Sequence, residues 1–133
     1  MITVTAKDAL RTAQLTPGWK HGKCVSHEPA TAGDGSIYHK FGIEVNASDE
    51  GFPNPVPLKE YNVSEKAVSM GKAFFIACGF PESEWDNLMK GKSTSAVIDE
   101  KSCIGKEFQV MVINTKYQNR VSNEAGDFLP LQK

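Results

Sequence analysis

Residues 104–131 contain the pattern that most constrains the fold of this chain, a strand followed by its return partner. Side chains alternate along the first part, with Phe108, Val110 and Val112 on one face and Gln109, Met111 and Ile113 on the other. Because both faces are largely apolar, the pattern favours a core strand over an edge strand. Polar residues then indicate a turn over residues 114–119 and a short return strand through Arg120 and Val121.

A second alternation, the most regular in the chain, covers residues 37–45. One face carries Ile37, His39, Phe41, Ile43 and Val45, and the other carries Tyr38, Lys40, Gly42 and Glu44. We expect the first face to lie in the core. The pair Asp34-Gly35 just before this strand is typical of a hairpin turn, so residues 19–27 are predicted to form its partner strand.

Helical patterns occur before and after these strands. Thr5 and Asp8 resemble a capping box for a helix over residues 5–15. After a loop over residues 46–57 and a third strand over 58–63, apolar spacing predicts a main helix over 67–79, capped by Ser64. A shorter helix begins at Pro81, and Asp99 caps a last turn that ends at residue 103. Five residues are predicted to be almost fully buried: Phe41, Ile43, Phe74, Val110 and Val112.

Composition limits the classes of protein to which the chain can belong. Its 133 residues, 40% hydrophobic and 23% charged, suit one domain with one core. The net charge of −1 gives no general basic field, so a nucleic-acid contact would need a local patch. No apolar run approaches the roughly 20 residues of a membrane span, and the N-terminus lacks a signal-peptide pattern, so we expect a cytoplasmic protein with no membrane partner. Three widely spaced cysteines, Cys24, Cys78 and Cys103, indicate free and mostly buried thiols.

The order of these elements predicts the fold class. A helix, three strands, a helical insertion and two strands make a mainly β protein with helical insertions, of the α+β class. Five short strands with a helix after the third are typical of a Greek-key barrel of the OB type. Residues 1–133 are therefore expected to form a single OB-like domain, with an N-terminal helix over 5–15 and a helical insertion over 64–103.

The chain also resembles a family of phage-encoded, OB-fold proteins similar to single-stranded-DNA-binding proteins. The resemblance covers most of the chain and is carried by short motifs: residues 15–19 (LTPGW), 35–45, 67–79 and 104–108 (IGKEF), with Tyr117, Arg120, Asn123 and Phe128. It implies a non-catalytic protein of phage replication or recombination that binds single-stranded DNA with weak sequence preference, in the host cytoplasm. Many single-strand-binding proteins end in an acidic tail that recruits partners, whereas residues 128–133 read FLPLQK.

Binding of a single strand requires aromatic faces for the bases and cations for the phosphates. The pattern offers such residues on each strand: Tyr38 and Lys40 on the second, Lys59 and Tyr61 expected on the same face of the third, Tyr117 and Arg120 at the last turn, and Lys20 and Lys23 on the first. An alternative for any one of them is equally open, namely that the tyrosines complete the barrel packing and that the lysines are merely solvated.

Metal binding and catalysis are both disfavoured by the sequence. His21, Cys24 and His27 are spaced by three, and His39 lies on the paired strand, but on a regular strand Cys24 points away from His21 and His27. Three ligands would converge only if the strand bulged, so we predict surface histidines, no metal and no cofactor. Cys78 lies on the apolar face of the main helix, where burial disfavours the thiolate, and no catalytic motif is present.

A second class of function uses the same small barrel to bind another protein, because a fold does not determine a function. The protein would then be an interaction or structural accessory protein of a phage that binds a host or replication protein. An exposed apolar patch would support this class, and the candidates for it are Phe52, Phe80, Trp85 and Phe128. Replication or recombination proteins and further copies of the chain are also expected as partners.

Overall fold

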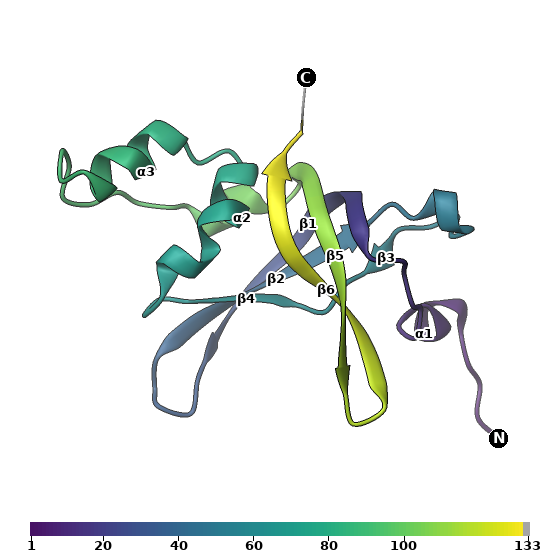
Figure 1. Ribbon diagram of the computed structural model, residues 1–133. Coiled ribbons are helices and arrows are strands. Elements are labelled where there is room, and N and C mark those ends of the chain that lie inside the picture. The colour runs from purple at the N-terminus through teal and green to yellow at the C-terminus, as the bar shows by residue number, and fades with distance from the viewer. Residues whose placement is uncertain (132–133) are drawn as a thin grey trace.

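The computed structural model describes residues 1–131 and consists of one six-stranded antiparallel sheet with short helices packed beside it (Figure 1). The strand order is β3-β2-β1-β5-β6, and β4 also pairs with β2. The mainly β, α+β class is therefore confirmed. The strands are β1 (Gly18–Thr31), β2 (Ile37–Val45), β3 (Val56–Pro57), β4 (Tyr61–Ser64), β5 (Glu107–Tyr117) and β6 (Arg120–Pro130). The α-helices are α1 (Ala6–Leu10), α2 (Lys72–Ala77) and α3 (Glu82–Met89), and the 3-10 helices are η1 (Ser48–Glu50), η2 (Val68–Gly71) and η3 (Glu100–Cys103).

Strand β1 is the element on which the sheet is built, because it pairs with two neighbours. Its first half pairs with β5 and its second half with β2. The close approach of β5 requires a glycine at position 22, where an added Cβ would lie 2.7 Å from a Val110 side-chain carbon. A bulge between Cys24 and Ser26 shifts the register with β2. At this bulge the backbone of Cys24 hydrogen-bonds to Gly105 and Lys106, which attaches the segment after η3 to β1.

Of the third strand predicted over residues 58–63, only residues 61–63 lie in a strand, β4. A separate strand of two residues, β3, forms just before the predicted range, so the sheet has six strands instead of five. The amide of Leu58 donates to the carbonyl of Ile43, whereas the amide of the next residue, Lys59, donates to the carbonyl of Asn123 on β6 (2.8 Å). The chain therefore leaves β2 after β3 and returns to it only at β4. Within residues 1–131, β4 and β6 do not pair as strands, and the sheet is not closed into a barrel.

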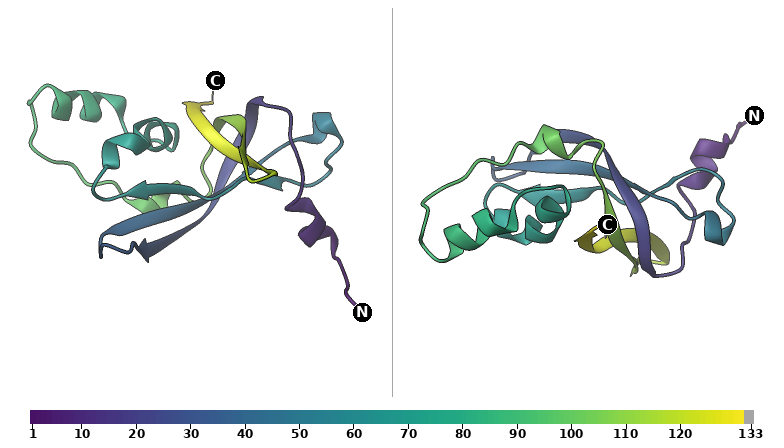
Figure 2. Two further views of the ribbon diagram at one scale, coloured as in Figure 1. Left: turned by 60° about the horizontal axis from the view of Figure 1, so that its bottom comes forward. Right: turned by 90° about the horizontal axis from the view of Figure 1, so that it is seen from above.

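Helix α2 lies against β6 (Figure 2). It contributes the fully buried side chain of Phe74 to the core. The Phe74 ring packs against those of Phe41, Phe108 and Phe128, with ring centroids 4.7–5.9 Å apart. All five residues predicted to be almost fully buried, Phe41, Ile43, Phe74, Val110 and Val112, have at most 1% of their surface exposed. The predicted core is confirmed.

The helices differ from the sequence prediction mainly in their lengths. Helix α1 has the expected capping box between Thr5 and Asp8 but ends at Leu10 instead of residue 15. The helix predicted over 67–79 is divided into η2 and α2, and Gly71 at their junction packs so closely on Val63 that an added Cβ would lie 3.1 Å from it. Ser64 accepts a hydrogen bond from Lys66 in the preceding turn instead of capping the helix.

Three further sequence predictions concern the last two helical segments, membrane-spanning helices and the C-terminal segment. Helix α3 and the turn η3 form where they were predicted, and the Asp99 side chain accepts a hydrogen bond from the Lys101 amide at the start of η3. No helix within residues 1–131 is both long and apolar enough to cross a membrane. The C-terminal segment 128–133, which stands where many single-strand-binding proteins have an acidic tail, is described as far as Leu131. Residues 132–133 lie outside the described part of the chain.

Candidate nucleic-acid interface and histidine cluster

Tyr38 and Lys40 lie on the outer face of β2, away from the core residues that alternate with them. Tyr38 is opposite Ser64 on β4 and Ala30 on β1, and Lys40 is opposite Asn62 and Glu28. Both side chains are half-buried. Since no salt bridge within the described chain involves Lys40, its ammonium group is available to a ligand.

Tyr61 was predicted to share this outer face, and the structure corrects that prediction. The register pairs Tyr61 directly with Phe41, so its ring lies on the core face of the sheet. There it packs against Phe74 (5.2 Å) and Phe128 (4.8 Å), and its hydroxyl donates to the carbonyl of Met70. Burial raises the pKa of Tyr61 above its ordinary value. The alternative that this tyrosine completes the packing is therefore the correct one.

The three remaining predicted lysines differ in their availability. Lys20 is almost buried and forms an ion pair with Glu50, which in turn lowers the pKa of Glu50 to about 2. Lys59 is exposed beside Glu124 on β6 (3.0 Å). Lys23 lies between Glu44 and Glu107 in the register of the sheet. Lys20 is thus excluded from a phosphate contact, whereas the exposed Lys59 and Lys23 are each beside at least one carboxylate.

Tyr117 and Arg120 lie at the tip of the β5–β6 hairpin, on either side of its two-residue turn. The turn residues Gln118 and Asn119 have φ values of 47° and 68°, which suit the twist of a tight hairpin. Tyr117 is 75% exposed and directly opposite Arg120. The hairpin therefore presents one free aromatic face and one cation to solvent.

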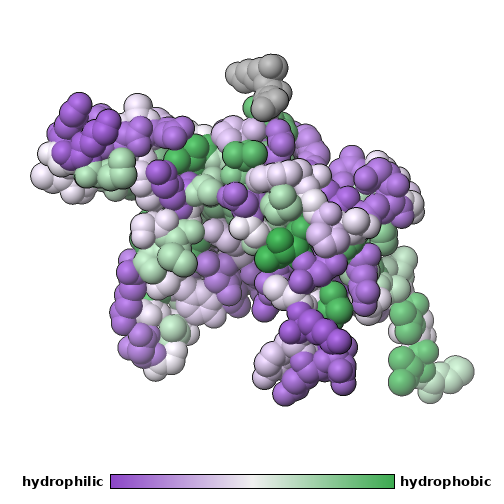
Figure 3. Space-filling model, viewed as in Figure 1, coloured by the Kyte–Doolittle hydropathy of each residue, from purple (hydrophilic) through white to green (hydrophobic). Residues whose placement is uncertain are grey.

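The two groups of residues lie on hairpins that extend from the same side of the molecule (Figure 1). The β1–β2 hairpin carries Tyr38 and Lys40, and the β5–β6 hairpin carries Tyr117 and Arg120. Both hairpin tips are covered with hydrophilic residues (Figure 3). Between the β3–β4 segment and β6 lies a groove of about 510 Å³, lined by Lys59 and by Arg11, a cation that the sequence analysis did not identify.

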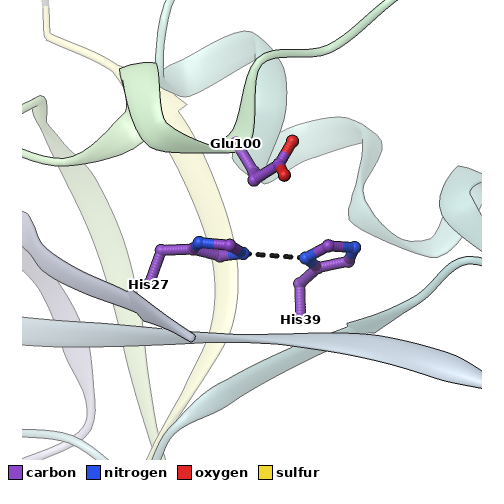
Figure 4. Close-up of side chains that lie close together, drawn as sticks. All are labelled: His27, His39 and Glu100. Carbon is purple, nitrogen blue, oxygen red and sulfur yellow. Dashed lines mark hydrogen bonds between the residues drawn. The ribbon is translucent and has the colours of Figure 1, made fainter. Parts of the chain in front are cut away.

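A second group of side chains, on the core face of β1 and β2, consists of His27, His39, Glu65 and Glu100. The histidines had been predicted to be surface residues, but they are partly buried and their rings are stacked. His27 Nε2 lies 2.7 Å from His39 Nδ1 (Figure 4). On the other side of that ring, His39 Nε2 lies 2.7 Å from an oxygen of Glu65. Burial, together with the neighbouring His39, lowers the pKa of His27. We name these four residues the histidine cluster.

The bulge explains why the sequence did not indicate this cluster. His21 stays on the outer face and contacts Glu107 (2.8 Å), as regular alternation predicts. Past the bulge the alternation shifts by one residue, which puts His27 on the same face as Cys24. The two carboxylates come from separate segments, Glu65 from the turn just after β4 and Glu100 from η3, and neither has a local motif that would have identified it.

The three cysteines are free and buried, as predicted. Burial raises the pKa of the Cys24 thiol to about 11. The Cys78 thiol has a raised pKa because it is hydrogen-bonded to Cys103 and buried. Neither thiol is activated as a nucleophile.

The apolar patch predicted for a protein partner does not form as expected. Phe128 is a core residue, and Phe52, Phe80 and Trp85 are each half-buried. An apolar groove of about 360 Å³ does lie along α3, between Trp85, Met89 and Val68.

Comparison with models of known protein families found no match, and comparison with curated protein sequences found no significant match.

Proposed function

We propose that this protein binds single-stranded DNA with weak sequence preference, through the two hairpins and the sheet surface between them. The observation that carries the proposal is an aromatic residue next to a cation on each of two hairpins that extend from one side of the molecule (Figure 1): Tyr38 and Lys40 on one face of β2, and Tyr117 opposite Arg120. Such pairs supply stacking for bases and charge for phosphates, and they need no catalytic group. Tyr61 and Lys20 are not part of this interface.

A hydrogen bond between two segments that do not pair in the sheet also supports the proposal. The Lys59–Asn123 hydrogen bond joins the segment before β4 to β6, at the position where a barrel of the OB type would close. In OB folds, oligonucleotides bind across the strand face between two hairpin loops. We propose that this chain is a distorted member of that class, with a cytoplasmic role in phage replication or recombination.

The charge distribution predicts how binding would depend on salt. The whole protein has a net charge of −1, and Lys59 is already paired with Glu124. The attraction for DNA therefore comes from a few cations, among them Lys40 and Arg120. Affinity should be modest for a single protomer and should decrease steeply as the salt concentration rises.

The test is a fluorescence titration of the purified chain with labelled oligothymidine at low and at moderate salt. We expect binding that weakens as salt increases and that is reduced when Tyr117 is replaced by Ala. Tyr117→Phe is the matched control, since it keeps the aromatic face and should keep the affinity. A folded sample that does not bind oligothymidine even at low salt would refute the proposal.

The alternative function, an accessory protein that binds another protein, is supported by the apolar groove along α3. Met89 and Val97 near this groove are 66% and 91% exposed. Exposed apolar side chains grouped in this way are typical of a protein contact. Failure of the oligothymidine titration would leave this function as the better proposal.

A further inference from the structure

We propose that His27, His39 and Glu100 form a binding site for one divalent transition metal ion of the zinc class. The metal-ligating atoms of these three residues all lie within 4.8 Å of one another. Ligands of a tetrahedral zinc ion, about 2.0–2.2 Å from the metal, are separated from one another by about 3.3 Å. Small side-chain rotations are therefore sufficient to bring the three atoms to that spacing.

The position of each ligand is determined by the backbone. The register of β1 with β2 places His27 opposite Phe41, so that His39, two residues earlier on β2, is its diagonal neighbour. Glu100 lies on η3, across from the two histidine rings (Figure 4). Backbone hydrogen bonds from Gly105 and to Lys106 attach the segment after η3 to Cys24, at the bulge that turns His27 inward. The three ligands thus belong to elements that are already connected.

Glu65 has the role that a carboxylate often has beside a metal-bound histidine. It accepts a hydrogen bond from His39 Nε2, so the Nδ1 atom of that ring is the one that carries a lone pair. In the structure this lone pair is directed at His27 Nε2, 2.7 Å away, and Glu100 lies across from the two rings (Figure 4). Loss of the proton from His27 Nε2 would leave both nitrogens able to bind one metal ion. A carboxylate that fixes the tautomer and the orientation of a histidine in this way is a common partner of metal ligands.

Two imidazoles and one carboxylate are a ligand set for zinc and for other first-row divalent metals. Three protein ligands leave a fourth coordination position for water or a small anion. The cavity beside the cluster, about 340 Å³ in volume and lined by His39, Glu65 and Glu100, has room for that group. A bound metal would join the helical insertion, through η3, to the β1–β2 hairpin.

The test is a calorimetric titration of the chelator-treated full chain with ZnCl₂, followed by the visible absorption spectrum with Co²⁺. We expect one ion per chain and a Co²⁺ spectrum without a thiolate charge-transfer band, because the three ligands are nitrogen and oxygen atoms. His39→Gln and Glu100→Gln should each weaken zinc binding by more than about 100-fold, and Glu65→Gln should weaken it by about 10- to 100-fold. Zinc should also raise the melting temperature of the wild-type chain.

His21→Gln is the matched control, because His21 lies on the opposite face of β1 and should not affect zinc affinity. Circular dichroism checks that each variant is folded, and Glu100→Gln replaces a partly buried side chain by one of nearly the same size, so this variant should keep the fold. The proposal is overturned if the wild-type chain binds no zinc, if Glu100→Gln binds zinc as well as the wild type, or if a thiolate band shows that the cysteines hold the metal.

Discussion

The two faces of the β1–β2 hairpin carry different chemistry although their residues alternate along the same strands. His39 lies between Tyr38 and Lys40 in the sequence, but its side chain is only 16% exposed and contacts His27 and Glu65. Its neighbours Tyr38 and Lys40 lie on the outer face. Within the described residues, Lys40 takes part in no salt bridge. The core face therefore holds its polar groups in a defined network, and the outer face leaves them free.

This difference shows what each face can do. A network of partly buried groups at short distances is already organised, which suits a small ion that needs several ligands at once. An outer face with separate aromatic and cationic side chains suits a long, flexible chain that makes many weak contacts. Substitutions on one face should therefore leave the function of the other unchanged, and this independence can be measured.

The largest effect is expected on the core face, from Phe74→Ala. Phe74 is fully buried among Phe41, Phe108 and Phe128, so its removal leaves a cavity and should lower the free energy of unfolding by about 3–5 kcal/mol. Urea denaturation followed by circular dichroism measures this change. Phe52→Ala, at a half-buried position at the edge of the core, is the comparison and should cost less. An unchanged denaturation midpoint for Phe74→Ala would contradict the assigned core.

The next effect is on the outer face, from Tyr38→Ala. If the ring stacks on a base, the substitution should weaken oligothymidine binding by about 1–3 kcal/mol with little change in the salt dependence. Tyr61→Phe is the control from the core face, because it removes only the hydroxyl that donates to Met70 and should leave DNA affinity unchanged. Equal losses for the two variants would mean that the faces are not independent.

A smaller change is expected from Lys40→Gln, in the salt dependence of binding. Loss of one phosphate contact should lower the magnitude of the slope of log K against log salt by about 0.7, the value for a single strand. Lys90→Gln, at the end of α3 and far from both hairpins, should leave the slope unchanged. Titrations at several salt concentrations measure both slopes, and an unchanged slope for Lys40→Gln would remove this lysine from the interface.

The smallest effect on DNA binding is expected from His39→Gln, which should leave the affinity for oligothymidine unchanged. His39 lies between two proposed DNA contacts in the sequence but on the other face of the sheet, so its loss should reduce zinc binding alone. Oligothymidine titration of this variant, at equal folded concentration, is the measurement. A large loss of DNA affinity would show that the two faces are coupled.

The parts of the fold that depend on local pattern were predictable. Alternation over residues 37–45 and 108–113 identified the strands, and the same periodicity identified Phe41, Ile43, Val110 and Val112 as core residues. Capping residues identified the starts of α1 and η3. These predictions succeeded because side-chain direction follows from the backbone period and needs no information about distant residues.

The candidate sites were predictable only where the local rule held. Tyr38 and Lys40 lie half-buried on the outer face of β2, and Tyr117 and Arg120 are exposed at the ends of β5 and β6, as their neighbours in the sequence indicated. Tyr61 was placed on the wrong face because the third strand was predicted to begin at residue 58, whereas β4 begins at Tyr61. The pairing of Tyr61 with Phe41 then depends on where the chain rejoins β2, and the side-chain period alone does not determine that register.

The sequence by itself determined the alternation of β2 and of the first part of β5, which of those residues are apolar enough for the core, and that the cysteines are free. It did not determine the extent of the last hairpin: a turn was predicted over 114–119 with a short return strand, whereas β5 continues to Tyr117 and β6 runs from Arg120 to Pro130.

The tertiary structure alone decided the histidine cluster, since one bulged residue in β1 reverses the alternation and turns His27 inward. It also decided which carboxylates accompany the histidines, because Glu65 and Glu100 reach them through strand pairing and through the attachment of η3 to Cys24. Contacts of this kind depend on hydrogen bonds between distant segments, and no local pattern of residues encodes them.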